Sequence, residues 1–345
     1  MAGRMSGLVI GVMKIMKIMK IMAVTKITAV MKIMEIQRLE GSCFMENAKK
    51  PVIFRIPKQL IIAGMVLFAL IFGYSFIVLK NLISAGFPIW LLLAFRFFFG
   101  TLLLLALRRA APFQPFDRAT VRAGLLVGAA IFLAYAFQTF GLELTTPAKN
   151  GLFTGLYVII VPLIMMALKR KISWRPLLTA PLCFAGIACV SGVWGEALNL
   201  NNGDALTICC ALFFAFHLIL LERYAPVLPA LNFSAVQLGT VALCAAALSW
   251  FTEKDAYAAV AWAAALPGLL FLTVFSTGLA FFFQTLAQSR ISANTTAVVL
   301  CLESVFAVIF SVFYGFDRFT FSFAAGSVLI IAAMLLVSLN RREEI

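Results

Sequence analysis

The sequence predicts an all-α integral membrane protein that crosses the bilayer ten times. Hydrophobic residues make up 63% of its 345 residues and charged residues only 12%, whereas soluble domains carry roughly a quarter charged residues. Apolar runs recur almost without interruption from Leu60 to Leu339, and a helix needs about 20 such residues to cross a bilayer. A soluble fold could not bury so much apolar surface.

Residues 1–56 differ in kind from the rest of the chain. They form a low-complexity basic leader, with Met-Lys-Ile repeats at 13–22, followed by a short cytoplasmic tail. A continuous apolar core ending in a small-residue cleavage site, the mark of a signal peptide, is missing. We therefore expect a dispensable extension, with Met45 as an alternative start of translation.

The apolar runs and the breaks between them define the ten spans. The breaks carry loop chemistry, such as Ser-Ala-Gly before Pro88 and Thr-Thr-Pro at 145–147. We expect the spans near residues 60–79, 88–107, 123–142, 150–168, 176–194, 203–221, 231–251, 262–286, 294–314 and 321–339.

Two short loops set the predicted orientation, because lysine and arginine accumulate in cytoplasmic loops. The loop after the second span and the loop after the fourth are strongly basic; they carry Arg108, Arg109, Arg118 and Arg122, and Lys169, Arg170, Lys171 and Arg175. Both loops are therefore expected in the cytoplasm, which places both termini there as well. Outside the leader, the basic residues gather in short loops between the spans, as expected of cytoplasmic loops, and we expect no nucleic-acid partner.

The chain also repeats itself. A shift of 146 residues sets Phe137-Gln138-Thr139 on Phe283-Gln284-Thr285, in each case before a polar break and a new apolar run. This predicts two five-helix halves, at 57–195 and 196–345. Because five is odd, the second half would enter the membrane upside down, which gives the inverted repeats that many secondary transporters use for alternating access.

The stretch from Gly141 to Leu163, the Arg-Phe at 96–97 and the Leu-Glu at 302–303 resemble the EamA-type transporters of the drug/metabolite transporter superfamily. The resemblance extends from about Pro57 to Asn340. It implies ten helices in two repeats, a bacterial inner membrane, and export of amino acids, other metabolites or toxic compounds, without choosing among these solutes.

Apart from Asp204 at the beginning of the sixth predicted span, Arg96 and Glu303 are the only formally charged residues inside the ten predicted spans. A charge buried in lipid costs about 2.5–3.5 kcal/mol on insertion scales, so such residues face a cavity or a partner. Glu303 is either a proton-exchanging or substrate-contacting carboxylate, or a hydrogen-bonded structural acid. Arg96 would bind an anionic substrate or pair with Glu303.

The repeat offset places Tyr157 opposite Glu303, in the fourth and ninth spans. Asn150, Thr154 and Tyr157 share one helix face, and Thr296, Leu300 and Glu303 share the corresponding face. We expect these faces to line the interior, with a phenol on one wall of a pocket and a carboxylate on the other.

Other polar side chains inside the spans are weaker candidates. His217 would relay protons or act as a packing donor. Gln138, Gln284 and Tyr135 would line a cavity or tie neighbouring helices together. A single histidine and scattered cysteines give no metal site, and we expect no cofactor.

The sequence lacks the phosphate-binding loop of nucleotide-driven pumps and two common hydrolase motifs. We therefore expect no enzyme but a secondary carrier, an exporter of small metabolites, amino-acid-like solutes or drugs, with protons as a candidate coupling ion. The alternatives are a membrane-embedded lipid-handling protein and a non-transporting sensor or scaffold. The substrate, the coupling ion and a homodimeric state stay open.

Overall fold

The computed structural model describes residues 57–110, 114–168 and 200–338, with four further positions at 182, 185, 186 and 189. All of them belong to one compact unit of the chain. The predicted leader at 1–56, the predicted fifth span at 176–194, the basic loop at 169–175 and the end of the chain after residue 338 lie outside this described part, apart from those four positions.

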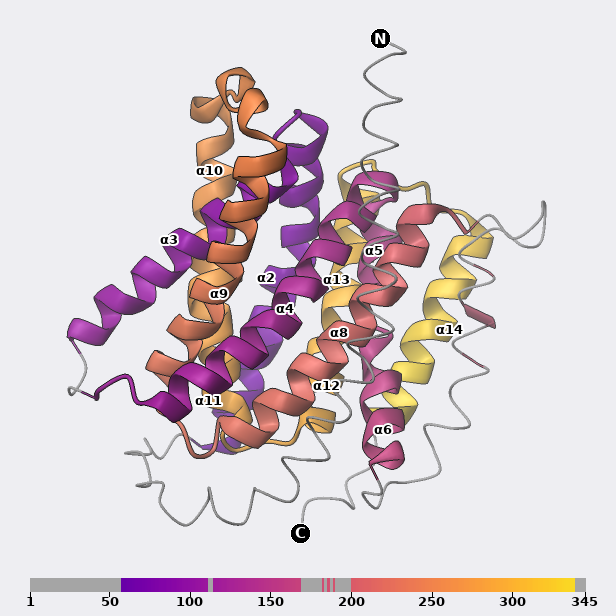
Figure 1. Ribbon diagram of the computed structural model, residues 1–345. Coiled ribbons are helices and arrows are strands. Elements are labelled where there is room, and N and C mark those ends of the chain that lie inside the picture. Colours follow the sequence, from indigo (N-terminus) through magenta and orange to yellow (C-terminus); the bar gives the residue numbers. More distant parts are fainter. Residues whose placement is uncertain are drawn as a thin grey trace. The chain divides into compact units, whose positions relative to one another are not determined.

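The described residues form helices joined by short connections (Figure 1). Eight segments are long and apolar enough to cross a membrane. They are α2 (Lys58–Ser84), α3 (Ile89–Arg109), α4 (Arg118–Leu144), α5 with α6 (Pro147–Thr154 and Tyr157–Ala167), α8 (Asn202–Tyr224), α9 (Ala230–Thr252), α10 with η2 and α11 (Trp262–Thr273, Val274–Leu279 and Ala280–Gln288), and α12 with α13 (Ala293–Leu300 and Leu302–Phe313).

A ninth apolar helix, α14 (Phe321–Ser338), follows these segments, and a short 3₁₀ helix, η1 (Lys254–Ala259), precedes α10. Nine of the ten predicted spans therefore coincide with apolar helices. Large apolar side chains remain exposed on several of these helices, among them Leu243, Phe251 and Phe313 at 73–80%. Such surfaces are rare on soluble proteins and suit contact with lipid.

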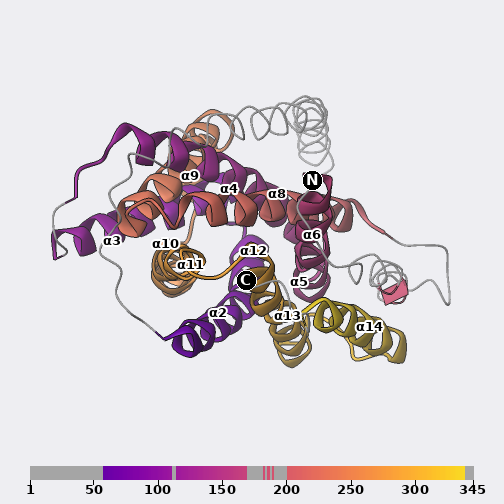
Figure 2. The same cartoon turned by 90° about the horizontal axis from the view of Figure 1, so that it is seen from below.

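The helices pack in two groups. The first is a row in which α9 lies between α3 and α4, and α4 lies between α9 and α8. The second contains α2, the α10–α11 segment, α12, α13 and α14. Seen from below, α10 and α11 overlap along one axis, and the two groups lie on opposite sides of the figure (Figure 2). Helices from before residue 195 thus pack mainly against helices from after it.

Glycines permit the closest of these approaches. At Gly128 of α4, an added Cβ atom would lie 2.8 Å from the carbonyl oxygen of Gln237 in α9. Gly141 of α4 and Gly203 of α8 face each other, since a Cβ atom on either would lie within 3 Å of the carbonyl oxygen of the other. Small residues let transmembrane helices pack through their backbones, as at these sites.

Two spans carry the same distortion at equivalent places. The α5–α6 segment and the α12–α13 segment each begin after a hydroxyl N-cap, Thr146 and Ser292, which lie 146 residues apart. Each segment is then interrupted by a tight turn, at Gly155 and at Cys301, again 146 residues apart. The repeat predicted from the sequence is therefore present in the local geometry, and each turn lies directly before a candidate site residue.

Candidate functional site

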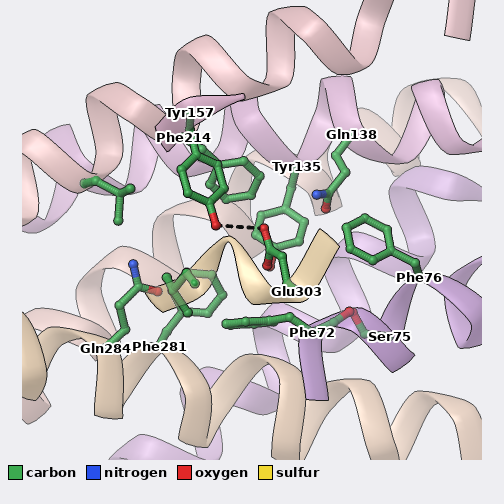
Figure 3. A pocket seen from close by; sticks show the side chains of 12 residues that line it. Phe72, Ser75, Phe76, Tyr135, Gln138, Tyr157, Phe214, Phe281, Gln284 and Glu303 are labelled. Atoms are coloured by element: carbon green, nitrogen blue, oxygen red, sulfur yellow. Dashed lines mark hydrogen bonds between the residues drawn. The ribbon is translucent and has the colours of Figure 1, made fainter. Parts of the chain in front are cut away.

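A pocket lies between the two groups of helices and is partly open to the outside. The empty space among its lining residues, counted together with that open part, is about 430 Å³. Side chains from α2, α4, α6, α8, α11, α12 and α13 line it (Figure 3). They are Phe72, Ser75, Phe76, Tyr135, Gln138, Tyr157, Phe214, Leu218, Phe281, Gln284, Leu300 and Glu303.

Tyr157 and Glu303 meet in this pocket. The hydroxyl of Tyr157 donates a hydrogen bond of 3.1 Å to the Glu303 carboxylate (Figure 3). Both side chains are buried, at 3% and 8% exposure, and each follows the tight turn of its own span. The sequence predicts a phenol and a carboxylate on facing walls of a pocket, and in the structure these two groups are in direct contact.

The pocket lies where the repeated halves meet. Four pairs of lining residues are separated by the repeat offset of 146: Phe72 and Leu218, Tyr135 and Phe281, Gln138 and Gln284, and Tyr157 and Glu303. Three of these pairs match in size or polarity. The fourth places the pocket's only carboxyl group on one side alone, so a nearly symmetric cavity has an acidic group on one wall.

Arg96 does not pair with Glu303, so that interpretation was wrong. Arg96 is fully buried in α3, and its Nε and Nη2 atoms donate to Thr277 (2.8 Å) and Ser276 (3.2 Å) of η2. Among the described residues it forms no ion pair with a carboxylate. Its guanidinium lies 4.8 Å from the ring centroid of Tyr135, so it stands behind the pocket wall.

The π-helical geometry of η2 accounts for this arrangement. Single π-helical turns are rare and often accompany functional sites. Here the turn presents Ser276 and Thr277 to Arg96 at neighbouring positions, while Gly278 lets α3 approach closely. The Nη1 atom of Arg96 has no hydrogen-bond partner.

His217 also lies outside the pocket. It is fully buried, its Nε2 atom lies 3.4 Å from Oε1 of Gln237, and its ring packs edge-on against Phe281, which does line the pocket. Its Nδ1 atom has no partner. His217 therefore lies one layer behind the wall, between α8 and α9.

Asn150 and Thr154 share a face with Tyr157, as predicted, but they do not line the pocket. Asn150 donates to Thr207 of α8 (2.7 Å) and to the carbonyl of Gln138. Thr154 accepts from Gln138 and lies 3.9 Å from the Cys210 sulfur. The expectation that this whole face lines the cavity was wrong, because α8 covers its first two turns.

Further polar contacts between the two halves lie at the N-terminal end of α8. Asp204, fully buried, accepts a 2.6 Å hydrogen bond from Thr145 and lies 3.7 Å from the Lys149 ammonium. Asn201 donates to the carbonyl of Leu144. A polar ladder, defined by the contacts of Thr145, Lys149, Asn150 and Thr154 with α8, thus joins the two halves beside the pocket.

On the other face, Thr296 is buried and does not line the cavity, whereas Leu300 and Glu303 do. Gln138, Gln284 and Tyr135 are lining residues. No group of three potential metal ligands occurs among the residues that the structure describes.

The sequence did not identify the aromatic walls. Phe72, Phe76, Phe214 and Phe281 line the pocket, together with Ser75. The sequence does space Phe72, Ser75 and Phe76 three or four residues apart, which assigns them to one face of a helix. Among 34 phenylalanines, however, spacing alone cannot separate a cavity-facing ring from a lipid-facing one.

Comparisons with known proteins agree with this architecture. A model of the EamA-like transporter family matches residues 59–192 and again 201–339. A curated protein of Archaeoglobus fulgidus, described as an uncharacterized transporter, is 30% identical over 278 residues, which cover 80% of this chain and 85% of that protein. One crystal structure shares the fold with a TM-score of 0.58 and 21% identity, over 79% of this chain and 98% of the other. The chain is a multi-pass membrane transporter of the EamA-like family, within the drug/metabolite transporter superfamily.

Proposed function

We propose that this protein is a secondary carrier that exports a small organic solute by alternating access, with Glu303 as the proton- and substrate-binding group. The observation that carries the proposal is the Tyr157–Glu303 contact, made across a pocket at the junction of the two halves. Carriers built from repeats place their sites at this junction. Intramembrane carboxyl groups commonly mark proton relays.

The proposed topology has ten helices in two inverted halves, with both termini in the cytoplasm of a bacterial cell and the protein in its inner membrane. The paired distortions at Gly155 and Cys301 support equivalent halves. An odd number of spans per half requires the predicted fifth span at 176–194. The basic loop between α3 and α4 supports the orientation.

The polar ladder and the glycine contacts between α4 and α8 support alternating access. They hold the halves together along one side of the pocket, so one set of contacts must open while another closes as the site changes sides. The solute would be a small metabolite, an amino-acid-like compound or a drug.

Export can be tested by comparing the extracellular metabolites of cells that express the wild type, the Glu303→Gln variant or neither protein, at matched membrane levels. We expect at least one solute to be enriched outside only with the wild type. Enrichment that is equal with the variant would remove Glu303 from the mechanism. A lack of enrichment with the wild type, together with uptake of a solute instead, would contradict export.

A further inference from the structure

The pocket offers several hydrogen-bond acceptors that have no partner among its own donors. The hydroxyl proton of Ser75 is used on the carbonyl of Phe72 (2.7 Å), and that of Tyr157 on Glu303. Gln138 directs its amide nitrogen to Thr154, and Gln284 directs its own to Gln288. The carbonyl oxygens of both glutamines and the carboxylate of Glu303 remain as acceptors, beside the second amide hydrogen of each glutamine and the Tyr135 hydroxyl.

The rest of the lining is aromatic. Rings from Phe72, Phe76, Phe214 and Phe281 and the two tyrosines surround the carboxyl group (Figure 3). Aromatic faces attract cations, more strongly where water is excluded. None of the twelve lining residues is cationic, and Arg96 directs two of its nitrogen atoms to η2.

We propose that the pocket binds a small organic monocation, an amine with an aromatic or apolar body, in place of the proton on Glu303. The ammonium group donates to the carboxylate and to the glutamine carbonyls, while the aromatic walls hold the body. This rests on the proposed carrier function and specifies its substrate class. Proton and ammonium each bring one positive charge, so the displaced proton leaves to water and the pocket stays neutral in either state.

Other ionisable groups near Glu303 do not compete for this role. They are Tyr157 from α6, Tyr135 from α4 and Cys210 from α8, with Cys301 at the turn before α13. None of these groups is cationic. The cation nearest to them is Arg96 of α3, which lies behind the Tyr135 ring and does not line the pocket. Exchange of a proton for an ammonium ion on one carboxylate makes the two ligands mutually exclusive, which is the requirement for antiport.

Three compounds with the same phenyl ring and different head groups test the proposal: phenethylamine, phenylalanine and 3-phenylpropionate. Their binding to the purified full-length protein in detergent is measured by calorimetry at pH 7.5 and again at lower pH. We expect phenethylamine to bind, to bind more weakly as the pH falls, and to outcompete the other two. Tighter binding of phenylalanine or phenylpropionate, or no binding of phenethylamine, would overturn the proposal.

Variants separate the two parts of the site. Glu303→Gln should weaken phenethylamine binding by about 10- to 100-fold, the loss expected for one charge-assisted hydrogen bond. Phe214→Leu should weaken it several-fold, whereas Phe271→Leu, at a half-buried phenylalanine outside the pocket, should not. Size-exclusion elution of each variant shows whether it is folded, and the phenylalanine pair keeps the test decisive if Glu303→Gln does not fold.

Failure of this inference is distinguishable from failure of the carrier proposal. Export that depends on Glu303 without phenethylamine binding would leave the carrier in place and overturn the cation site. Conversely, phenethylamine binding that requires Glu303, in a protein that moves no solute in cells, would support the cation site and overturn the carrier.

Discussion

Asn150 and Thr207 are joined by a hydrogen bond of 2.7 Å between α5 and α8, at a point where both side chains are fully buried. The amide nitrogen of Asn150 also donates to the backbone carbonyl of Gln138 in α4. One side chain therefore ties three helices together and connects the first half of the chain to the second. The contact lies at the centre of the polar ladder.

The Asn150–Thr207 contact should stabilise the folded protein measurably. We expect a coupling free energy of about 0.5–2 kcal/mol, because buried polar pairs in membranes contribute in this range. The measurement is a double-mutant cycle with Asn150→Leu, Thr207→Val and both together, read as unfolding free energy in mixed micelles. Strictly additive effects would show that the two groups do not interact.

Replacement of Gly128 by alanine should destabilise the protein. The new Cβ atom would lie within 3 Å of Thr240 and of the Gln237 carbonyl, so α4 and α9 would have to move apart. Gly239→Ala is the matched control, since its nearest neighbour there, Thr101, is 3.7 Å away. Alanine favours helices by up to about 1 kcal/mol over glycine, so the control should be neutral or slightly stabilising in thermal unfolding.

Arg96 is expected to act on structure rather than on substrate choice. Lysine at this position cannot reproduce the forked donation to Ser276 and Thr277. Arg96→Lys and Arg96→Ala should therefore both lower the unfolding temperature, and the correctly folded fraction should keep the ligand preference of the wild type. A changed preference between phenethylamine and phenylalanine in Arg96→Lys would instead place the guanidinium in the binding site.

Much of this architecture could be predicted because bilayer thickness constrains the chain so strongly. Helices of about 20 apolar residues stand out in the sequence, and the repeat at an offset of 146 located both Tyr157 and Glu303. The offset also relates their N-caps, tight turns and glutamines, which shows how far local sequence dictates local geometry here.

The positions of Arg96 and of Asn150 could not be predicted in the same way. Helix periodicity gives the face of a side chain, but it does not give the neighbouring helix that covers that face. Arg96 contacts two hydroxyl groups because α10 continues into a π-helical turn, and no sequence pattern predicted that turn. Asn150 does not line the pocket because α8 packs over it.

Glu253 should make stability depend on pH at the end of the bundle. It follows α9, and its two carboxylate oxygens accept from the backbone nitrogens of Trp90 (3.0 Å) and Leu91 (2.9 Å) in the first turn of α3. Burial raises the pKa of Glu253, while these hydrogen bonds offset part of that increase. A raised pKa means that the folded state binds the proton more tightly than the unfolded state.

The sign of the effect follows from that difference. The contribution of Glu253 is greatest below its unfolded pKa and is lost as the pH rises through its folded pKa. Lowering the pH from 7 to 4 should therefore stabilise the wild type relative to Glu253→Gln, which has no such proton to bind. The measurement is the unfolding temperature of both proteins across this pH range. A difference in unfolding temperature between them that stays constant with pH would contradict the prediction.

Tyr157→Phe should preserve the fold and alter the state of the Glu303 carboxyl group. The ring is retained, so packing against Phe214 survives, while the single hydrogen bond to the carboxylate is removed. Infrared difference spectra across a pH titration report the protonated carboxyl group directly through its C=O stretch. We expect this band to be absent in Glu303→Gln and to move to higher frequency in Tyr157→Phe, because a carbonyl that accepts no hydrogen bond has a stiffer C=O bond. A band at the wild-type position in Tyr157→Phe would mean that the hydroxyl does not bind the protonated acid, and the phenol would then act only as part of the aromatic wall.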